Sequence, residues 1–164
     1  MTPNENELVR AFVVLYGGKS VESFWVKKIR GRQYEVCTIP FFAYNVSLGD
    51  IVRCAPDEDG EGLFVERVLK KSGNRTVRIA FKAVEGGRHP EALKFRQWLQ
   101  RNKHDFDYND IRLFSINVPS DEVYARIQAR LKKINESAQM VWEDGDPQPG
   151  VNLDGTDQST VSEQ

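Results

Sequence analysis

The first half of the chain alternates short apolar stretches with turn-forming residues. Five stretches rich in β-branched and aromatic residues predict strands, at residues 7–16, 21–29, 32–39, 50–55 and 63–71. Gly17-Gly18 and Arg30-Gly31 predict turns, and Pro40 ends the third strand because proline has no amide donor. Short strands joined by turns at this spacing predict a small, strongly bent β-sheet or open barrel.

The second half combines strands with two amphipathic helical patterns. A strand is predicted where apolar and polar residues alternate, at residues 75–84. Helix, strand, strand, helix and strand then follow at residues 89–103, 104–108, 111–118, 120–134 and 138–142. This order predicts a ferredoxin-like β-α-β-β-α-β sandwich with both helices on one face of an antiparallel sheet. Without a strand at residues 104–108, a simpler βαβαβ layer remains.

The stretch "IPFFAYNVSLGDIV", from Ile39 to Val52, places three aromatic residues in a predicted loop. Phe41, Phe42 and Tyr44 are too large to remain together in water, so either an internal joint or a partner protein covers them. Because neighbouring residues of an extended segment face opposite ways, we expect one Phe to pack inside and the other to stay partly exposed. We predict that these three aromatic residues form the partner-binding site.

Charge is distributed unevenly along the 164 residues, although the formal net charge is -1. All 23 Lys and Arg residues precede Glu143, whereas the chain from Glu143 onward is acidic and carries few apolar residues. Such a segment cannot bury enough apolar surface to offset its chain entropy. We therefore predict a β-rich subdomain at residues 1–72, a ferredoxin-like α+β subdomain at 73–143 and a disordered acidic tail at 144–164.

Membrane and secreted classes are disfavoured. No apolar run approaches the roughly 20 residues that a membrane-spanning helix needs, and the polar start "MTPNENELVR" is unlike a secretory signal. Cys37 and Cys54 are the only cysteines, and neither has a neighbour at metal-ligand spacing. We therefore expect a cytoplasmic protein with two buried free thiols and no membrane partner.

Catalytic and metal-binding patterns are weak. His89 and His104 are the only histidines and lie about a helix length apart, so they are not placed to cooperate in acid–base catalysis. Asp105 and Asp107 share one face of a predicted strand beside Asp110, but a metal site needs several converging ligands. We interpret these acids as solvated groups flanking a hairpin, and we predict no catalytic residue, no metal site and no cofactor.

A cluster of basic residues supports an alternative function, nucleic-acid binding. Five residues that could neutralise phosphates lie close together in the sequence, namely Arg67, Lys70, Lys71, Arg75 and Arg78. A ferredoxin-like sheet binds RNA through aromatic residues on its open face. Here the first strand of that sheet would present Thr76, Arg78, Ala80 and Lys82 on this face, with no aromatic pair. Nucleic-acid binding therefore ranks second.

Several stretches together resemble a known bacterial family. They are "VESFWVKKI", "YEVCTIPFFAYNVSLGDIV", "SGNRTVRI" and "FSINVPSDEVYARIQARL", and the family is domain of unknown function 4265. The resemblance spans roughly Leu8 to Glu143, and its most specific part is the motif from Pro40 to Val52. It implies a small soluble bacterial protein and supplies no activity, cofactor or site residue.

The combined features favour a non-enzymatic α+β protein that acts by binding another protein. An immunity or antitoxin-type inhibitor of a bacterial toxin is a concrete role of this kind. A nucleic-acid-associated regulator is the alternative, and an enzyme of unknown class is the third hypothesis. The sequence does not define the oligomeric state.

Overall fold

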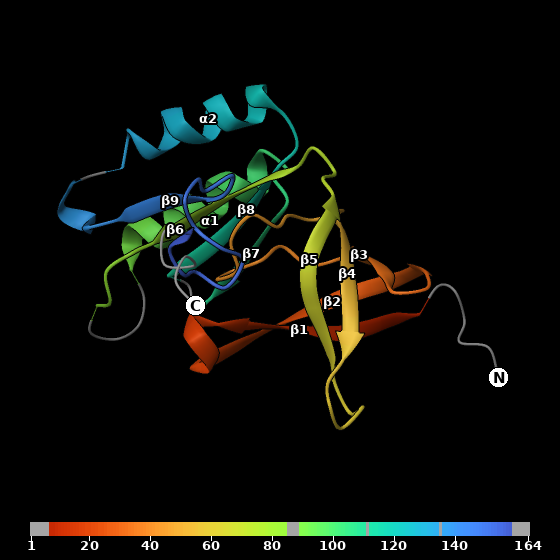
Figure 1. Cartoon of the computed structure of the whole chain (residues 1–164). Coiled ribbons are helices and arrows are strands. Elements are labelled where there is room, and N and C mark those ends of the chain that lie inside the picture. Colours follow the sequence, from red (N-terminus) through yellow and green to blue (C-terminus); the bar gives the residue numbers. More distant parts are fainter. Residues whose placement is uncertain (1–6, 85–88, 111, 135, 159–164) are drawn as a thin grey trace.

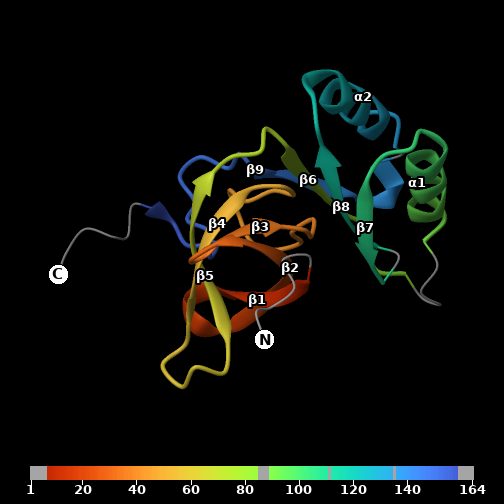
Figure 2. The same ribbon diagram turned by 90° about the vertical axis from the view of Figure 1, so that its right-hand side faces the viewer.

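The computed structural model describes residues 7–84, 89–110, 112–134 and 136–158. The protein has an α+β architecture, in which a five-stranded ring-like sheet is followed by a second antiparallel sheet with two helices (Figure 1). Seen from the side, the second sheet lies between the barrel and the two helices (Figure 2). The predicted fold class is therefore confirmed at this level.

The first five strands close into a barrel in the order β1-β2-β3-β4-β5. Their bounds are β1 Leu8–Leu15, β2 Ser20–Arg30, β3 Gln33–Val36, β4 Ile51–Pro56 and β5 Leu63–Lys70, with the short 3-10 helix η1 at Tyr16–Gly18. Neighbouring strands are antiparallel, except that β1 and β5 close the ring in parallel at Phe12 and Phe64. Alternate strand residues, such as Phe24, Val26 and Val52, fill the barrel core.

The second sheet has the strand order β7-β8-β6-β9, with every neighbouring pair antiparallel. The elements are β6 Arg75–Ala80, α1 Pro90–Arg101, β7 Phe106–Asn109, β8 Leu113–Val118, α2 Asp121–Leu131, the 3-10 helix η2 Glu136–Ala138 and β9 Val141–Asp146. Both helices pack on the same face, where Phe95, Leu99 and Ile127 meet Ile79 and Phe114. The presence of β7 excludes the simpler βαβαβ layer.

Local sequence explains where the helices begin. Pro90 occupies the first turn of α1, and the side chain of His89 caps that helix by accepting from the backbone N–H of Ala92. Ser120 caps α2 in the same way through the N–H of Val123, and acidic residues follow in the first turn. Both helices therefore start at the residues that the sequence predicts.

The segment between β3 and β4, residues 37–50, joins the barrel to the second sheet. It covers the sheet face opposite the helices, and Ser115 on β8 donates a hydrogen bond to the carbonyl oxygen of Pro40. As a result, Thr76, Arg78 and Asn117 on this face are buried. Of the four side chains that the sequence places on the open face of the first strand, Thr76 and Arg78 are thus covered by the other half of the chain, whereas Lys82 is exposed.

The C-terminal segment is ordered as far as the structure describes it. Residues 144–146 belong to β9, and the chain beyond them returns to the barrel, where the backbone N–H groups of Tyr16 and Tyr44 bind the carbonyls of Asp154 and Leu153. The prediction of a disordered tail over 144–164 is therefore wrong for residues 144–158. Its remaining part, residues 159–164, lies outside the described residues.

Candidate functional site

Glu22 on β2 holds the aromatic part of the Ile39–Val52 stretch. Its carboxylate is buried and accepts the backbone N–H groups of three consecutive residues, Phe41, Phe42 and Ala43, at 2.6–3.0 Å. Three charge-assisted hydrogen bonds to one side chain fix the path of this loop. The two neighbouring phenyl rings are therefore presented by an ordered backbone.

The three predicted partner-binding residues lie in different surroundings. Phe41 is half-buried, Phe42 is exposed, and their ring centroids lie 6.3 Å apart. The predicted split is therefore found only in part, because Phe42 is exposed, whereas Phe41 is half-buried and does not pack fully inside. Tyr44 is half-buried, and its hydroxyl group donates to the carboxylate of Glu143 on β9.

A pocket opens beside these rings, between the joining segment and the edge of the second sheet. Its volume is about 270 Å³. We call it the aromatic groove and define it by Phe41, Phe42, Arg78, Leu113, Val141 and Trp142. Glu143 also lines it. Phe42, Val141 and Trp142 are exposed large apolar side chains, so the rim of the groove is apolar and accessible.

Arg78 is the buried cation of the aromatic groove, and its side chain is only 4% exposed. The guanidinium carbon lies 4.4 Å from the centroid of the Tyr44 ring, and Nε lies 3.3 Å from a carboxylate oxygen of Glu143. That contact is an ion pair without hydrogen-bond geometry, since no guanidinium nitrogen has a hydrogen-bond partner among the described residues. Gly145 lies against the group, because an added Cβ there would approach Nη2 to 2.5 Å.

The local charges also determine the protonation state of Tyr44. Burial raises the pKa of the Tyr44 phenol, and the Glu143 carboxylate raises it further, although Arg78 opposes this effect. The phenol therefore remains a neutral hydrogen-bond donor at neutral pH. The Arg78 guanidinium packs against both Tyr44 and Glu143.

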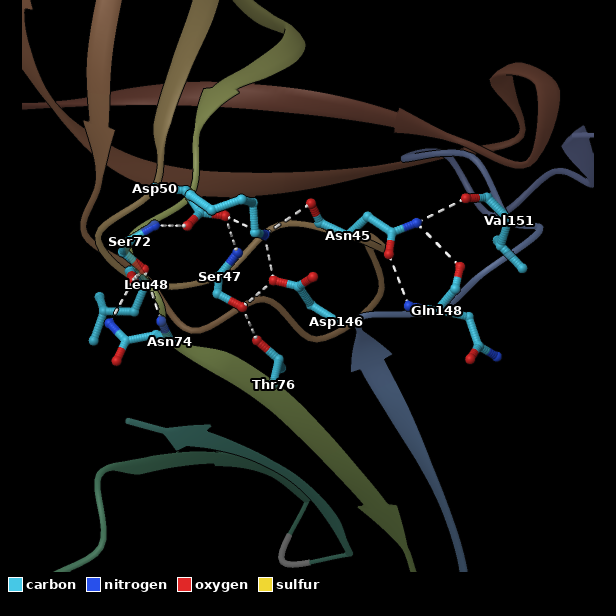
Figure 3. A network of polar contacts seen from close by, with 11 residues as sticks. Asn45, Ser47, Leu48, Asp50, Ser72, Asn74, Thr76, Asp146, Gln148 and Val151 are labelled. Carbon is cyan, nitrogen blue, oxygen red and sulfur yellow. Dashed lines mark hydrogen bonds and ion pairs between the residues drawn. The ribbon is translucent and has the colours of Figure 1, made fainter. Parts of the chain in front are cut away.

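A second polar cluster lies at the other end of the joining segment (Figure 3). We call it the polar junction and define it by Ser47, Asp50, Lys71, Thr76 and Asp146. Asp50 accepts the N–H groups of Ser47 and Ser72, and Lys71 binds both Asp50 and Asp146. Ser47 donates to Asp146 and shares a hydrogen bond with Thr76. The polar junction thus connects the barrel with β6 and β9.

The five basic residues proposed for nucleic-acid binding do not form one surface. Arg67 and Lys70 are exposed on β5, whereas Lys71 belongs to the polar junction. Arg75 stacks on the ring of Tyr124 at 3.9 Å, and Arg78 is buried in the aromatic groove. Lys71, Arg75 and Arg78 are therefore engaged with other side chains of the protein, although only Arg78 is buried.

The other polar candidates are scattered. Asp105 and Asp107 line a separate pocket with Trp25 and Cys37, whereas the ring of His104 packs against Trp98. Within the described ranges, no group of three or more His, Cys, Asp or Glu side chains is arranged to hold a metal ion. None of the described helices is long and apolar enough to cross a membrane.

The two cysteines are unsuited to nucleophilic chemistry. Both are free thiols; Cys54 is buried, and Cys37 is half-buried. Burial, together with the nearby Glu66, raises the pKa of Cys54 to about 12. Burial also raises the pKa of Cys37, and Glu35 adds to this increase. Both sulfurs therefore remain protonated at neutral pH.

Sequence reasoning missed Glu22, Arg78 and Asp146 as organising residues. Glu22 and Arg78 occupy positions that read as ordinary polar positions of amphipathic strands, and Asp146 falls in an acidic, glycine-containing stretch. The sequence signal is weak: Arg78 lies between two apolar residues in "VRIA", and Glu22 follows an apolar residue in "VESF". Such a signal does not identify the partner that the fold brings to the charge.

Comparisons with known proteins agree with this fold. Residues 22–142 match the family described as domain of unknown function (DUF4265). A solved structure described as a "hypothetical protein from Neisseria gonorrhoeae" superposes with a TM-score of 0.66 at 19% identity, covering 87% of this chain and 96% of that chain. At this identity the likeness supports the fold alone. No curated protein matches the chain.

Proposed function

The chain belongs to the DUF4265 family, whose description names no activity. From the structure we propose that it is a non-enzymatic protein-binding module that uses the aromatic groove. The observation that carries this proposal is the pocket itself. Its rim consists of exposed apolar residues on an ordered backbone, at the junction of the two halves. Interface centres are enriched in aromatic residues and arginine, and the groove contains both.

The position of the groove at a sheet edge supports a protein partner. Within the described residues, β9 pairs only with β6, so one edge of β9 is free near Val141 and Trp142. An exposed apolar edge strand is a site at which another chain can add or pack. Because Glu22 already fixes Phe41 and Phe42, binding would require little ordering of this loop.

The protein-binding proposal fits the chemistry better than the alternatives. The groove contains no described nucleophile or histidine, and the thiols lie elsewhere. The nucleic-acid alternative and the enzyme hypothesis stay predictions, but the dispersal of the five basic residues weakens the former. A role as a toxin inhibitor and a cytoplasmic location also stay predictions. We further classify the second half as a ferredoxin-like sandwich, supported by its strand order β7-β8-β6-β9.

The proposal can be tested with two matched pairs of variants. Trp142 and Trp25 are 42% and 44% exposed, but only Trp142 lines the groove. Phe42 and Leu69 are both 41% exposed, and only Phe42 lines it. Each residue is changed to Ala, and the tagged proteins are used to capture partners from cells of the native host.

The proposal predicts that Trp142→Ala and Phe42→Ala each deplete the same captured protein, whereas Trp25→Ala and Leu69→Ala retain it. Quantitative mass spectrometry measures the depletion relative to the unmodified protein. Equal recovery from all four variants would contradict binding through the groove. Nuclease treatment before capture identifies any protein that is retained only through nucleic acid.

A further inference from the structure

We propose that the aromatic groove binds the C-terminal residue of the partner protein, with a bulky apolar side chain against the aromatic rim and the terminal carboxylate at Arg78. This inference rests on the proposed function and specifies the chemistry of the partner. It starts from Arg78, a buried cation in a pocket whose other lining residues, apart from Glu143, are apolar. That cation and the size of the pocket together select the occupant.

Arg78 has unused capacity to bind an anion. Its guanidinium carries five N–H donors in a planar fork, and its nitrogens have no hydrogen-bond partner among the described residues. A buried donor without an acceptor is costly, and a carboxylate is the acceptor that matches the fork in charge and geometry. The existing ion pair with Glu143, at 3.3 Å, uses only part of this capacity.

Glu143 occupies the position that the ligand carboxylate would take. Its side chain is 40% exposed, so it can rotate into the solvent when another carboxylate arrives. The proposal requires this rotation to open a path to the guanidinium, because its nitrogens are shielded from the solvent in the structure. Tyr44 keeps the cation in place from its ring face. The ligand carboxylate thus replaces the Glu143 carboxylate beside Arg78 and accepts hydrogen bonds from the guanidinium with better geometry.

The volume of the groove favours a single residue. At about 270 Å³, it is slightly smaller than the roughly 300–1,000 Å³ typical of small-molecule sites. One residue would therefore supply both the apolar group for Phe42 and Val141, which lies on the same sheet face as Arg78, and the carboxylate for Arg78. The C-terminal residue of a chain carries both groups, because its main chain ends in a carboxylate.

Two small probes isolate the carboxylate, namely N-acetyl-phenylalanine and its C-terminal amide. Each is titrated to millimolar concentration into the full-length protein, and NMR follows the indole N–H signals of Trp142, Trp25 and Trp98. The acid is expected to shift the Trp142 signal alone, and the amide to bind at least about tenfold more weakly. Absence of binding by the acid, or equal binding by both probes, would overturn the proposal.

Removal of the competing carboxylate is a second test. Glu143→Gln is expected to tighten binding of the acid about threefold and to leave the amide unchanged, because the neutral side chain competes less for Arg78. Glu122→Gln on α2, which also removes one negative charge, is the matched control and is expected to change neither. Arg78→Gln is expected to abolish the preference for the acid. If that buried variant does not fold, Glu143→Gln decides the question.

The outcomes separate this inference from the proposed function. If acid and amide bind equally while Trp142→Ala still loses its captured protein, the groove binds a protein without reading a carboxylate. If the acid is preferred but Trp142→Ala retains every captured protein, the groove binds carboxylates without serving the proposed interface. An unchanged preference in Glu143→Gln would show that Glu143 does not hold the position of the ligand.

Discussion

The aromatic groove and the polar junction lie at opposite ends of one joining segment, yet their charged groups are satisfied to very different degrees. In the polar junction, each buried carboxylate accepts hydrogen bonds from several groups of the same chain. In the aromatic groove, the buried guanidinium has one ion pair and no hydrogen bond to the described residues, and the Phe42 and Trp142 side chains remain exposed. The first region is complete as a structural joint, and the second has capacity left for another molecule.

Burial of a charged residue therefore does not show by itself whether its hydrogen-bonding groups are satisfied. Asp50 and Arg78 are both buried charged residues, but only Asp50 has its hydrogen-bonding capacity used within the chain. Removal of a satisfied buried charge should therefore damage folding. Changes at the exposed rim of the groove should instead damage binding.

The largest effect is expected in the polar junction, from Asp50→Ala. The change leaves the cation of Lys71 with one carboxylate fewer and removes the acceptor for two backbone N–H groups. We expect a loss of about 3–5 kcal/mol in the free energy of unfolding, measured by urea denaturation. Asp121→Ala breaks the exposed ion pair with Arg75 and should cost less than about 1 kcal/mol. Equal losses would contradict a structural role for the junction.

The next effect concerns the attachment of the C-terminal segment at Asn45. Its amide donates to the carbonyls of Gln148 and Val151 and accepts from the N–H of Gln148, and its φ is 57°. Asn45→Gly keeps the left-handed conformation but removes these bonds, at a cost of about 1–3 kcal/mol.

Asn45→Ala adds the strain of a left-handed Ala and should cost about 1 kcal/mol more than Asn45→Gly. Thermal unfolding of both variants measures the two contributions separately. Unchanged stability in both variants would mean that residues 147–158 do not contribute to the fold.

A smaller, pH-dependent effect is expected at His104, outside both regions. Burial lowers the pKa of His104 below its ordinary value of 6.5, and the charge of Arg126 lowers it further. The folded state therefore favours the neutral ring. Its contribution to stability is present above about pH 6.5 and is lost as the pH falls toward the lowered pKa of the folded state.

His104→Phe keeps an aromatic ring against Trp98 and has no proton to gain. It should lose less stability than the unmodified protein between pH 7.5 and pH 5.5. Urea denaturation at the two pH values provides the measurement. Parallel losses in both proteins would exclude a titrating contribution from His104.

The smallest effect on stability is expected at the rim of the groove. Phe42→Ala should change the free energy of unfolding by less than about 1 kcal/mol, because Phe42 is 41% exposed and lies outside both apolar cores. Phe24→Ala in the barrel core is the matched comparison and should cost about 3–5 kcal/mol. A loss at Phe42 as large as that at Phe24 would place Phe42 in the internal joint.

Much of the fold follows from local sequence patterns. Alternation of apolar residues places the strands, and Pro90 and Ser120 mark the helix starts, because these features depend on the local backbone. The C-terminal segment was missed because it docks largely through hydrogen bonds to Asn45 and to backbone groups, which leave no hydrophobic pattern. Composition therefore gave the wrong result there.

The candidate site was predictable only in part. Phe41, Phe42 and Tyr44 stand out because large aromatic residues in a loop need an explanation. Trp142 and Arg78 lie far apart in the sequence, and the pairing of β9 with β6 brings them to the same pocket, where the joining segment adds Phe41 and Phe42. Their juxtaposition is a tertiary property that no spacing along the chain encodes.

Photo-crosslinking from position 42 is the most direct test of the proposed interface. A photoreactive benzoyl-phenylalanine at position 42, expressed in the native host, should give a defined adduct with one protein under illumination. The same residue at position 69, where the native Leu69 is equally exposed, should not give that adduct. An adduct of equal yield from both positions, or none from position 42, would contradict binding through the aromatic groove.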